Sequence, residues 1–253
     1  MDPSDIATNL RRVQARIEAA ARRAGRAPDG IVLVAVTKTQ PEAAVQSAYR
    51  AGVRHFGENR VEEGAPKMAA FNAWLGAARG STSAGGAAEV PTWHMIGHVQ
   101  HRKAAEAMRF DVIHSLDSLR LAERLERLAA PEDPPLRVLL ECNVAGEASK
   151  YGFALGDWQS QGQVRREFFD TVSAIGLLPH LDLQGLMTMA PVVAEPEQAR
   201  PVFAALRALR DALREEFPAR PLTQLSMGMT DDFEVAVEEG ATMVRVGRAI
   251  FGE

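Results

Sequence analysis

The sequence contains only one cysteine, Cys142, which excludes an internal disulfide and a cysteine-rich zinc site. It lies in an apolar run, so we expect an inert thiol of the core. No apolar run is long enough to span a bilayer, and the first residues, MDPSDIATNLRR, lack the basic-then-apolar order of a secretory signal. Neither sign of charge dominates, because 29 Lys and Arg against 33 Asp and Glu leave a net charge of −4. We therefore expect a cytoplasmic protein that binds neither nucleic acid nor membranes.

The 253 residues alternate between short apolar runs and longer helical patterns. Ser4–Ala24 has apolar residues on one helical face. Ile31–Lys38 is a continuous apolar run, which is typical of a strand buried on both faces. The later strand candidates are Arg54–Phe56, Trp93–Ile96, Val112–Ser115, Val138–Asn143, Leu181–Leu186, Thr223–Ser226 and Met243–Val246. The clearest later helices are Leu119–Leu128, Gln163–Ser173, Pro196–Glu216 and Asp231–Glu238.

This alternation of strands and helices predicts an α/β protein with a parallel sheet. Eight strand–helix units after one N-terminal helix predict a closed (β/α)8 TIM barrel, a single domain over residues 1–253. The alternative is an open doubly wound sheet, but no glycine-rich turn follows the first strand. Thr39 and Glu42 form a candidate capping box for the next helix. Gly76–Val90, rich in Gly, Ala and Ser, is predicted to be a flexible surface loop.

Candidate site residues are sought at the carboxyl ends of the strands, where such barrels carry their sites. Lys38 closes the first strand and could form a Schiff base with an aldehyde, provided that burial or a cation lowers its pKa. The alternative is a lysine that extends its charge into solvent from the barrel mouth, and Lys38 alone favours that interpretation. Asn59 follows the second strand in the motif HFGEN.

Arg245 is harder to explain as a surface residue. Alternation along its strand places it opposite the flanking valines and therefore inside the barrel. A buried guanidinium needs a partner. That partner is either a carboxylate, with Glu141 and Glu58 as candidates, or a bound anionic or heteroaromatic ligand.

The last two strands also predict a phosphate site. Ser226 offers a hydroxyl, and Gly247 allows the backbone to approach a ligand closely. The amides of Gly247 and Arg248 could open a short helix and bind phosphate, in the usual phosphate-binding region of this architecture. A lysine on the first strand together with this cradle suggests a phosphorylated aldehyde as cofactor. A barrel that binds a phosphosugar without any cofactor is a further alternative.

Two other groups of polar residues have simpler explanations. His94, His98 and His101 lack a carboxylate at metal-ligand spacing, so we expect structural or solvent-exposed histidines and no metal. Asp231 and Asp232 are expected to cap the helix that follows them.

Eight short motifs occur in order along nearly the whole chain. The set resembles the single-domain pyridoxal-phosphate homeostasis proteins, also called the proline-synthase co-transcribed family. It comprises VAVTKTQP (Val34–Pro41), HFGEN (His55–Asn59), WHMIGHVQ (Trp93–Gln100), IHSLD (Ile113–Asp117), EASKYGF (Glu147–Phe153), LQGLMTM (Leu183–Met189), LSMGMTDDFE (Leu225–Glu234) and MVRVGRAIFG (Met243–Gly252).

This resemblance implies a barrel like the N-terminal domain of alanine racemase, with pyridoxal 5′-phosphate (PLP) held as an internal aldimine on Lys38. It implies that Asn59 lies beside the cofactor and that Arg245 faces the pyridine nitrogen. It also implies phosphate contacts from Ser226, Gly247 and the backbone of Arg248. The family commonly has Ser or Thr where this chain has Arg248, which removes one hydroxyl contact. The segment 76–90 is longer than is usual in the family.

The resemblance implies a role in intracellular PLP homeostasis, and the alternative is a PLP-dependent amino-acid racemase. Racemisation needs an electron sink and a base on each face of the α-carbon. An arginine at the pyridine nitrogen weakens the sink, because adjacent cations repel, but alanine racemases share this feature, so it does not decide between the two. Tyr151 is the only candidate for the second base, since Tyr49 lies on an outer helix. We therefore expect a carrier that is not an enzyme, a monomer or weak dimer, with apo forms of PLP-dependent enzymes as its partners.

Overall fold

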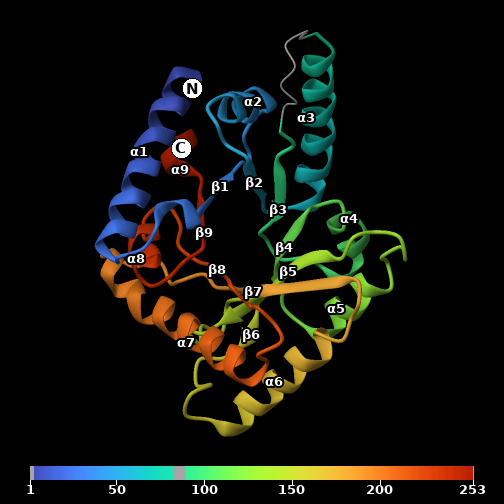
Figure 1. Cartoon of the computed structure of the whole chain (residues 1–253), viewed down its shortest axis with the longest axis vertical. Coiled ribbons are helices and arrows are strands. Elements are labelled where there is room, and N and C mark those ends of the chain that lie inside the picture. Colours follow the sequence, from blue (N-terminus) through green and yellow to red (C-terminus); the bar gives the residue numbers. More distant parts are fainter. Residues whose placement is uncertain (1–2, 82–88, 253) are drawn as a thin grey trace.

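The computed structural model describes residues 3–81 and 89–252, and these form a ring of helices around a central sheet (Figure 1). The strands are β1 (Val32–Val36), β2 (His55–Glu58), β3 (Thr92–Met95), β4 (Val112–Leu116), β5 (Leu136–Asn143), β6 (Phe153–Ala154), β7 (Leu181–Met187), β8 (Gln224–Ser226) and β9 (Met243–Val246). The helices are α1 (Pro3–Arg23), α2 (Glu42–Arg50), α3 (Val61–Ser81), α4 (Ala104–Ala107), α5 (Leu119–Glu126), α6 (Gly162–Ile175), α7 (Arg200–Glu216), α8 (Phe233–Glu238) and α9 (Arg248–Phe251). Short 3₁₀ turns occupy Pro28–Gly30, His101–Lys103 and Pro196–Ala199. None of the described helices is both long enough and apolar enough to cross a bilayer.

The sheet closes on itself into a parallel barrel. Its strand order is β4-β3-β2-β1-β9-β8-β7-β5, and β4 also pairs with β5. Every pairing between these strands is parallel. The predicted (β/α)8 barrel is therefore confirmed, and the open sheet is excluded. β6 is an additional two-residue strand on β5, too short for a hydrophobic pattern to reveal.

Apolar packing fills both sides of the strands. Inside the barrel, Val112, Leu139 and Met187 form a small cluster of buried side chains. A much larger cluster lies between the strands and the surrounding helices. Strands buried on both faces read as continuous apolar runs, which is why the sequence revealed them.

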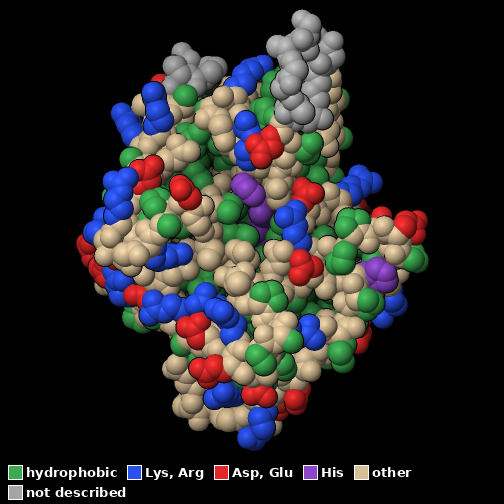
Figure 2. All heavy atoms as spheres, viewed as in Figure 1, with side chains coloured by type: hydrophobic (Ala, Val, Ile, Leu, Met, Phe, Trp, Pro, Cys, Tyr) green, Lys and Arg blue, Asp and Glu red, His purple; other side chains and the backbone are tan. Residues whose placement is uncertain are grey.

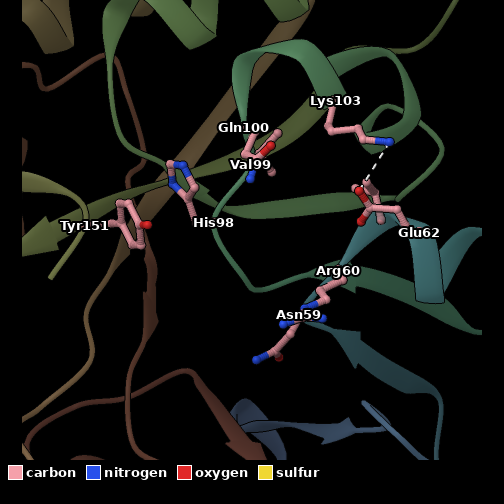
Figure 3. Close-up of a pocket in the computed structure, with 9 residues that line it drawn as sticks. Asn59, Arg60, Glu62, His98, Val99, Gln100, Lys103 and Tyr151 are labelled. Carbon is pink, nitrogen blue, oxygen red and sulfur yellow. Dashed lines mark ion pairs between the residues drawn. The ribbon is translucent and has the colours of Figure 1, made fainter.

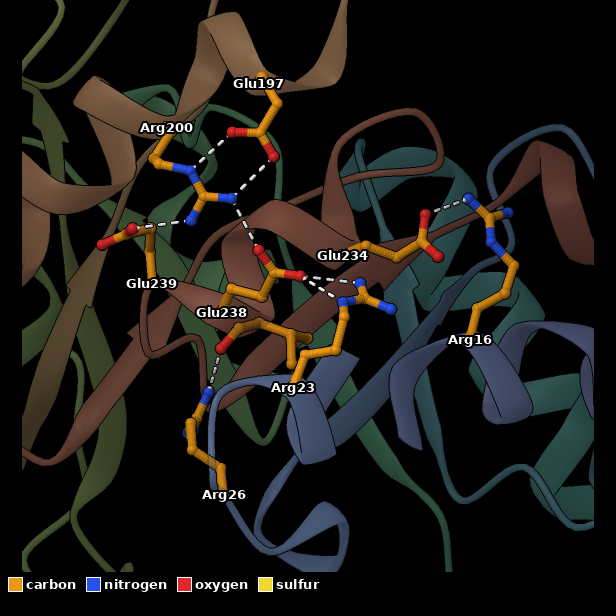
Figure 4. A network of polar contacts seen from close by, with 9 residues as sticks. Arg16, Arg23, Arg26, Glu197, Arg200, Glu234, Glu238 and Glu239 are labelled. Carbon is orange, nitrogen blue, oxygen red and sulfur yellow. Dashed lines mark hydrogen bonds and ion pairs between the residues drawn. The ribbon is translucent and has the colours of Figure 1, made fainter. Parts of the chain in front are cut away.

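The N-terminal helix closes the outer layer beside the end of the chain. Four apolar residues at helical spacing on α1 are buried: Ile6, Leu10, Val13 and Ile17. Figure 4 shows that Arg16 and Arg23 pair with Glu234 and Glu238 of α8, with nitrogen-to-oxygen distances of 2.8 Å. Exposed pairs of this kind contribute little stability, so the apolar stripe holds α1 in place and the ion pairs fix its direction.

Two local predictions are wrong. Gly76–Ser81 continue α3, because alanine and arginine are good helix formers; residues 82–88 of the expected loop lie outside the described residues. Thr39 and Glu42 form no capping box. The helix α2 has Pro41 at its N-cap, and no side chain caps it.

Candidate functional site

The predicted site residues follow four strands that are neighbours in the sheet, in the order β2, β1, β9, β8. Asn59 follows β2 directly, Lys38 lies two residues beyond β1, Gly247 follows β9, and Ser226 ends β8. Because the carboxyl ends of parallel strands share one rim, these residues meet at one mouth of the barrel. The structure thus places these residues on one rim of the barrel, and of them only Asn59 is among the residues that line the cavity described below.

Lys38 lies in a tight turn at this mouth. The N–H of Gln40 donates to the carbonyl oxygen of Thr37 at 3.0 Å, which closes the turn. Thr39 adopts a left-handed backbone conformation with φ of 62°, unusual for a residue branched at Cβ. The Lys38 side chain is exposed, whereas Thr37 is buried. Hydrogen bonds thus fix the backbone of this turn, while the side chain of Lys38 extends from it into solvent.

A buried polar cluster fixes this turn from below. Lys67 of α3 donates from Nζ to the Thr37 carbonyl oxygen at 2.6 Å and to Glu58 Oε1 at 2.7 Å. Thr37 Oγ1 donates to the same oxygen of Glu58 at 2.6 Å. Burial raises the pKa of Glu58, and the hydrogen bonds from Lys67 and Thr37 oppose that rise. Glu63 completes the cluster by accepting from Lys67 and from the Thr39 N–H. Sequence reasoning missed Lys67, and it named Glu58 only as a candidate partner of Arg245, whereas Glu58 pairs with Lys67.

A cavity of about 580 Å³ opens beside Asn59 (Figure 3). Its lining residues are Asn59, Arg60, Val61, Glu62, His98, Val99, Gln100, Lys103 and Tyr151. Asn59 stands against Gly97, where a Cβ would lie only 2.1 Å from the Asn59 carbonyl oxygen, so only glycine allows this approach. Across the cavity, Lys103 Nζ lies 3.2 Å from Glu62 Oε1.

Arg245 is buried in the barrel, as predicted, but its partners differ from those expected. Nη1 donates to Ser226 Oγ at 2.7 Å, and Nη2 donates to the Thr188 carbonyl oxygen at 2.9 Å. Within residues 3–81 and 89–252, neither Glu141 nor Glu58 forms an ion pair with it. Burial lowers the pKa of Arg245 to about 10, so the guanidinium stays protonated at neutral pH. It is therefore a buried cation whose hydrogen-bond partners are both neutral.

Glu141 lies near this cation on β5. Burial, together with the neighbouring Asp117, raises its pKa to about 7, and Arg245 opposes that rise. The Glu141 Oε2 atom has no hydrogen-bond partner in the described part of the chain. A neutral, protonated carboxyl is thus populated beside Arg245 at physiological pH.

Gly247 and Arg248 form the turn from β9 into α9. Gly247 packs against β1, where a Cβ would lie 3.3 Å from the Val36 carbonyl oxygen. The Arg248 side chain is exposed and pairs with Asp231. Asp231 therefore does not cap α8. Asp232 does not cap it either: it occupies the N-cap position, but its Oδ1 accepts from the Met229 N–H at 2.6 Å.

The histidines fall into two groups. His94 is buried, and its ring contacts His55 and His114. His98 lies on the rim with Nδ1 3.1 Å from Asp117 Oδ2, and its ring stacks on Tyr151 with centroids 3.9 Å apart. Tyr151 is 58% exposed, and its ring lies flat against His98 (Figure 3). Cys142 is buried, and burial raises the pKa of its thiol well above the ordinary value, as expected of an inert core residue.

The fold and the site define a class of proteins, the parallel (β/α)8 barrels with polar residues at the carboxyl-terminal mouth. Comparison with known families identifies the family within that class. Residues 8–253 match the family described as alanine racemase, N-terminal domain. The chain is 41% identical over 251 residues to the pyridoxal phosphate homeostasis protein of Pseudomonas aeruginosa, covering 98% of this chain and 96% of that protein. The protein of the same name from Aquifex aeolicus is 37% identical over 246 residues, covering 96% of each. The chain belongs to the pyridoxal phosphate homeostasis protein family, as its motifs indicated.

Solved structures agree with this assignment. PipY of Synechococcus elongatus, solved with PLP bound, is 33% identical with a TM-score of 0.77, covering 98% of this chain and 100% of PipY. A protein of unknown function from Bifidobacterium adolescentis has a TM-score of 0.85 at 36% identity, covering 99% of this chain and 97% of that one. Alanine racemase of Corynebacterium glutamicum is 17% identical with a TM-score of 0.63, and 62% of it is covered. That last likeness shows the fold alone.

Proposed function

We propose that this protein binds PLP at the carboxyl-terminal mouth of its barrel, holds it covalently through Lys38, and serves as a carrier in PLP homeostasis. Family membership and the PLP-bound structure of PipY support this proposal. When bound, PLP supplies an aldehyde that condenses with a primary amine. The exposed amine of Lys38, on a backbone turn fixed by Lys67 and Glu58, is suited to such a bond.

The residues at the mouth fit a phosphorylated aromatic aldehyde. Asn59 and Arg245 would hold the ring end. Ser226 and the backbone of Gly247 and Arg248 would hold the phosphate. The amides of Arg248 and Ala249 find no backbone acceptor in the described residues.

The observation that carries the proposal is the buried cation Arg245. Its two hydrogen-bond partners, the Ser226 hydroxyl and the Thr188 carbonyl, carry no charge. The nearby carboxyls of Asp232 and Glu141 favour its charged form but form no ion pair with it among the described residues. A bound anion or a ring nitrogen that keeps its lone pair meets this need. The same cation disfavours protonation of a pyridine nitrogen, which weakens the electron sink that racemisation requires.

A carrier without racemase activity also agrees with the placement of Tyr151. The ring of this tyrosine stacks on His98 and is largely exposed. Its hydroxyl makes no hydrogen bond with another described residue that would orient it as a base. A catalytic base is normally held in place by such a bond. We further propose that apo forms of PLP-dependent enzymes receive the cofactor, and that the carrier is a monomer or weak dimer.

Titration of the cofactor-free protein with PLP, followed by visible absorbance, tests the proposal. The wild type is expected to develop the absorbance of the covalently held cofactor at one equivalent, and Lys38→Ala is expected to develop none. Lys150→Ala is the matched control, because Lys150 also lies at the mouth, bonded to Glu147 and the Met189 carbonyl. Loss of the absorbance in Lys150→Ala with retention in Lys38→Ala would overturn the assignment of Lys38.

A further inference from the structure

Three histidines form a line of ring-nitrogen contacts through the barrel interior. His55 Nδ1 lies 3.0 Å from His94 Nε2, and His94 Nδ1 lies 2.8 Å from His114 Nε2. His114 Nδ1 then lies 2.8 Å from Ser226 Oγ, the atom to which Arg245 also donates. This histidine chain therefore connects the amino-terminal end of β2 with the mouth of the barrel.

Strand register explains why the three rings meet. His94 pairs with Gly57, which lies two residues beyond His55 on β2. His114 likewise lies two residues beyond Val112, the partner of His94 on the next strand. Side chains that point into a barrel recur at every second residue. From β2 to β3 and from β3 to β4, the histidine therefore shifts by two residues, one inward-facing position, towards the carboxyl end of the strands. The three rings thus lead from the amino-terminal end of the barrel towards Ser226.

Only the His55 end of the histidine chain reaches solvent. His94 and His114 are 1% and 0% exposed, and Ser226 is also 0% exposed. His55 is half-buried and lines a cavity of about 450 Å³ together with Gln14 and Glu18 of α1. Figure 2 shows histidine side chains in the centre of one molecular face. Among the members of the histidine chain, only His55 is therefore in contact with solvent in the ligand-free structure.

All three rings are neutral at physiological pH. Burial lowers the pKa of His94 well below its ordinary value, and burial together with Arg245 lowers the pKa of His114 to about 3. Burial and Arg137 also lower the pKa of His55, opposed by Glu89 and Asp111. A neutral imidazole has one N–H donor and one acceptor nitrogen. Consecutive hydrogen bonds along the chain must therefore all point the same way.

Two directions are possible, and they treat Ser226 differently. In the outward direction, Ser226 donates to His114 Nδ1, and each Nε2–H donates to the next ring. In the inward direction, His114 Nδ1–H donates to Ser226 Oγ, which already accepts from Arg245. The Ser226 hydroxyl proton then has no acceptor among the described residues. A buried donor without a partner is unfavourable, so the outward direction prevails until an acceptor arrives.

We propose that His114, held in line by His94 and His55, is a positioning residue that turns Ser226 into a hydrogen-bond donor for a bound phosphate oxygen. This inference rests on the proposed function, which puts the cofactor phosphate beside Ser226. A phosphate oxygen accepts a hydrogen bond from the Ser226 hydroxyl, and His114 Nδ1–H then donates to Ser226 Oγ from behind. Each histidine changes from the Nε2–H to the Nδ1–H tautomer.

The reversal conserves protons. Each N–H proton shifts along its hydrogen bond towards His55, and the Ser226 proton passes to His114 Nδ1. One proton leaves His55 Nε2 to water in the cavity. One proton reaches Ser226 Oγ from water, which balances the proton that His55 releases to water. Four protons occupy the line before and after, so ligand binding changes tautomers without charging any ring.

The tautomers can be read directly from ring-nitrogen chemical shifts of the ¹⁵N-labelled full chain. We expect Nε2–H at His94 and His114 in the cofactor-free protein, and Nδ1–H after saturation with inorganic phosphate or with PLP. Pyridoxal, which lacks the phosphate, is expected to leave both tautomers unchanged. Unchanged tautomers with bound phosphate or PLP would overturn this inference alone. Failure of PLP to bind would overturn the proposed function and this inference together.

Two substitutions of His114 test whether it acts through Ser226. His114→Phe is expected to weaken inorganic phosphate binding about fivefold, the effect of losing one hydrogen bond between neutral groups. His114→Asn, whose amide can occupy the place of Nδ1, is expected to retain most of the affinity. Adding Ser226→Ala to His114→Phe is expected to cause no further loss. Equal losses from Ser226→Ala in both backgrounds would contradict the positioning role.

Discussion

Lys67 Nζ lies 2.7 Å from Glu58 Oε1, with both side chains buried directly beneath the turn that carries Lys38. The same ammonium donates to the Thr37 carbonyl. Lys67 thus links α3, β2 and the backbone beside Lys38. A buried ion pair of this kind fixes geometry more than it adds net stability.

Replacing one partner of the Lys67–Glu58 pair measures how much the pair matters to the free energy of unfolding. Lys67→Met is expected to lower the free energy of unfolding by about 3–5 kcal/mol, because it leaves the Glu58 carboxylate buried without its cation. Urea unfolding measures this change. Lys103→Met is the control, since Lys103 is only half-buried and its partners Glu62 and Glu106 are exposed, so a much smaller loss is expected. Equal midpoints for the two variants would contradict the role assigned to Lys67.

The raised pKa of Glu141 predicts a dependence of stability on pH. The folded protein binds a proton at Glu141 up to pH of about 7, whereas the unfolded chain releases it near 4.5. Folding therefore takes up a proton between these values, and stability falls as pH rises through that window. Glu141→Gln is expected to remove up to about 3 kcal/mol of this dependence. If the free energy of unfolding changes equally with pH in Glu141→Gln and in the wild type between pH 4.5 and 7, this assignment to Glu141 is wrong.

Arg248→Thr is expected to keep or modestly tighten PLP binding. The Arg248 side chain is exposed and engaged with Asp231, and a threonine would supply the hydroxyl that the family resemblance implies at this position. One hydrogen bond to a charged group contributes roughly 1.5–3 kcal/mol, offset by loss of the arginine charge. Fluorescence titration with PLP measures the change, with Asp231→Asn as control. A large loss of affinity in Arg248→Thr alone would show that the guanidinium grips the phosphate.

The protein is expected not to racemise free amino acids at an enzymatic rate. Participation of a general base is typically worth a factor of about 10²–10⁴, and Tyr151 is stacked on His98 rather than oriented as a base. Exchange of the α-proton of L- and D-alanine in deuterated water measures this activity in the PLP-loaded protein. Rapid exchange that disappears in Tyr151→Phe would restore the racemase interpretation.

The barrel could be predicted from the sequence because strands buried on both faces leave continuous apolar runs. Arg245 could be placed inside the barrel because side chains alternate along a strand. Its partners could not be predicted, since Ser226 and Thr188 reach it only through the pairing of neighbouring strands. The segment from Gly76 to Ser81 is helical although the sequence predicts a loop there. Its glycine and serine residues indicate a loop, and its alanine and arginine residues, which favour a helix, outweigh them.

The Glu58–Lys67 pair and the histidine chain could not be predicted from the sequence either, because both depend on how separate elements pack together. Glu58 and Lys67 meet because α3 packs back on β2, and no spacing rule encodes that packing. His55, His94 and His114 lie on three strands, and only the register brings their rings into line. The cofactor contacts of Lys38 and Asn59, and the cytoplasmic location, stay predictions.

Covalent capture of the cofactor tests the central claim most directly. Borohydride reduces the bond between PLP and an amine to a stable linkage, and peptide mass spectrometry then locates the modified residue. After reduction of the PLP-loaded protein, one pyridoxyl group on the peptide that contains Lys38 is the predicted result. An unmodified Lys38 peptide, with the label on Lys150 or on no lysine, would contradict the account.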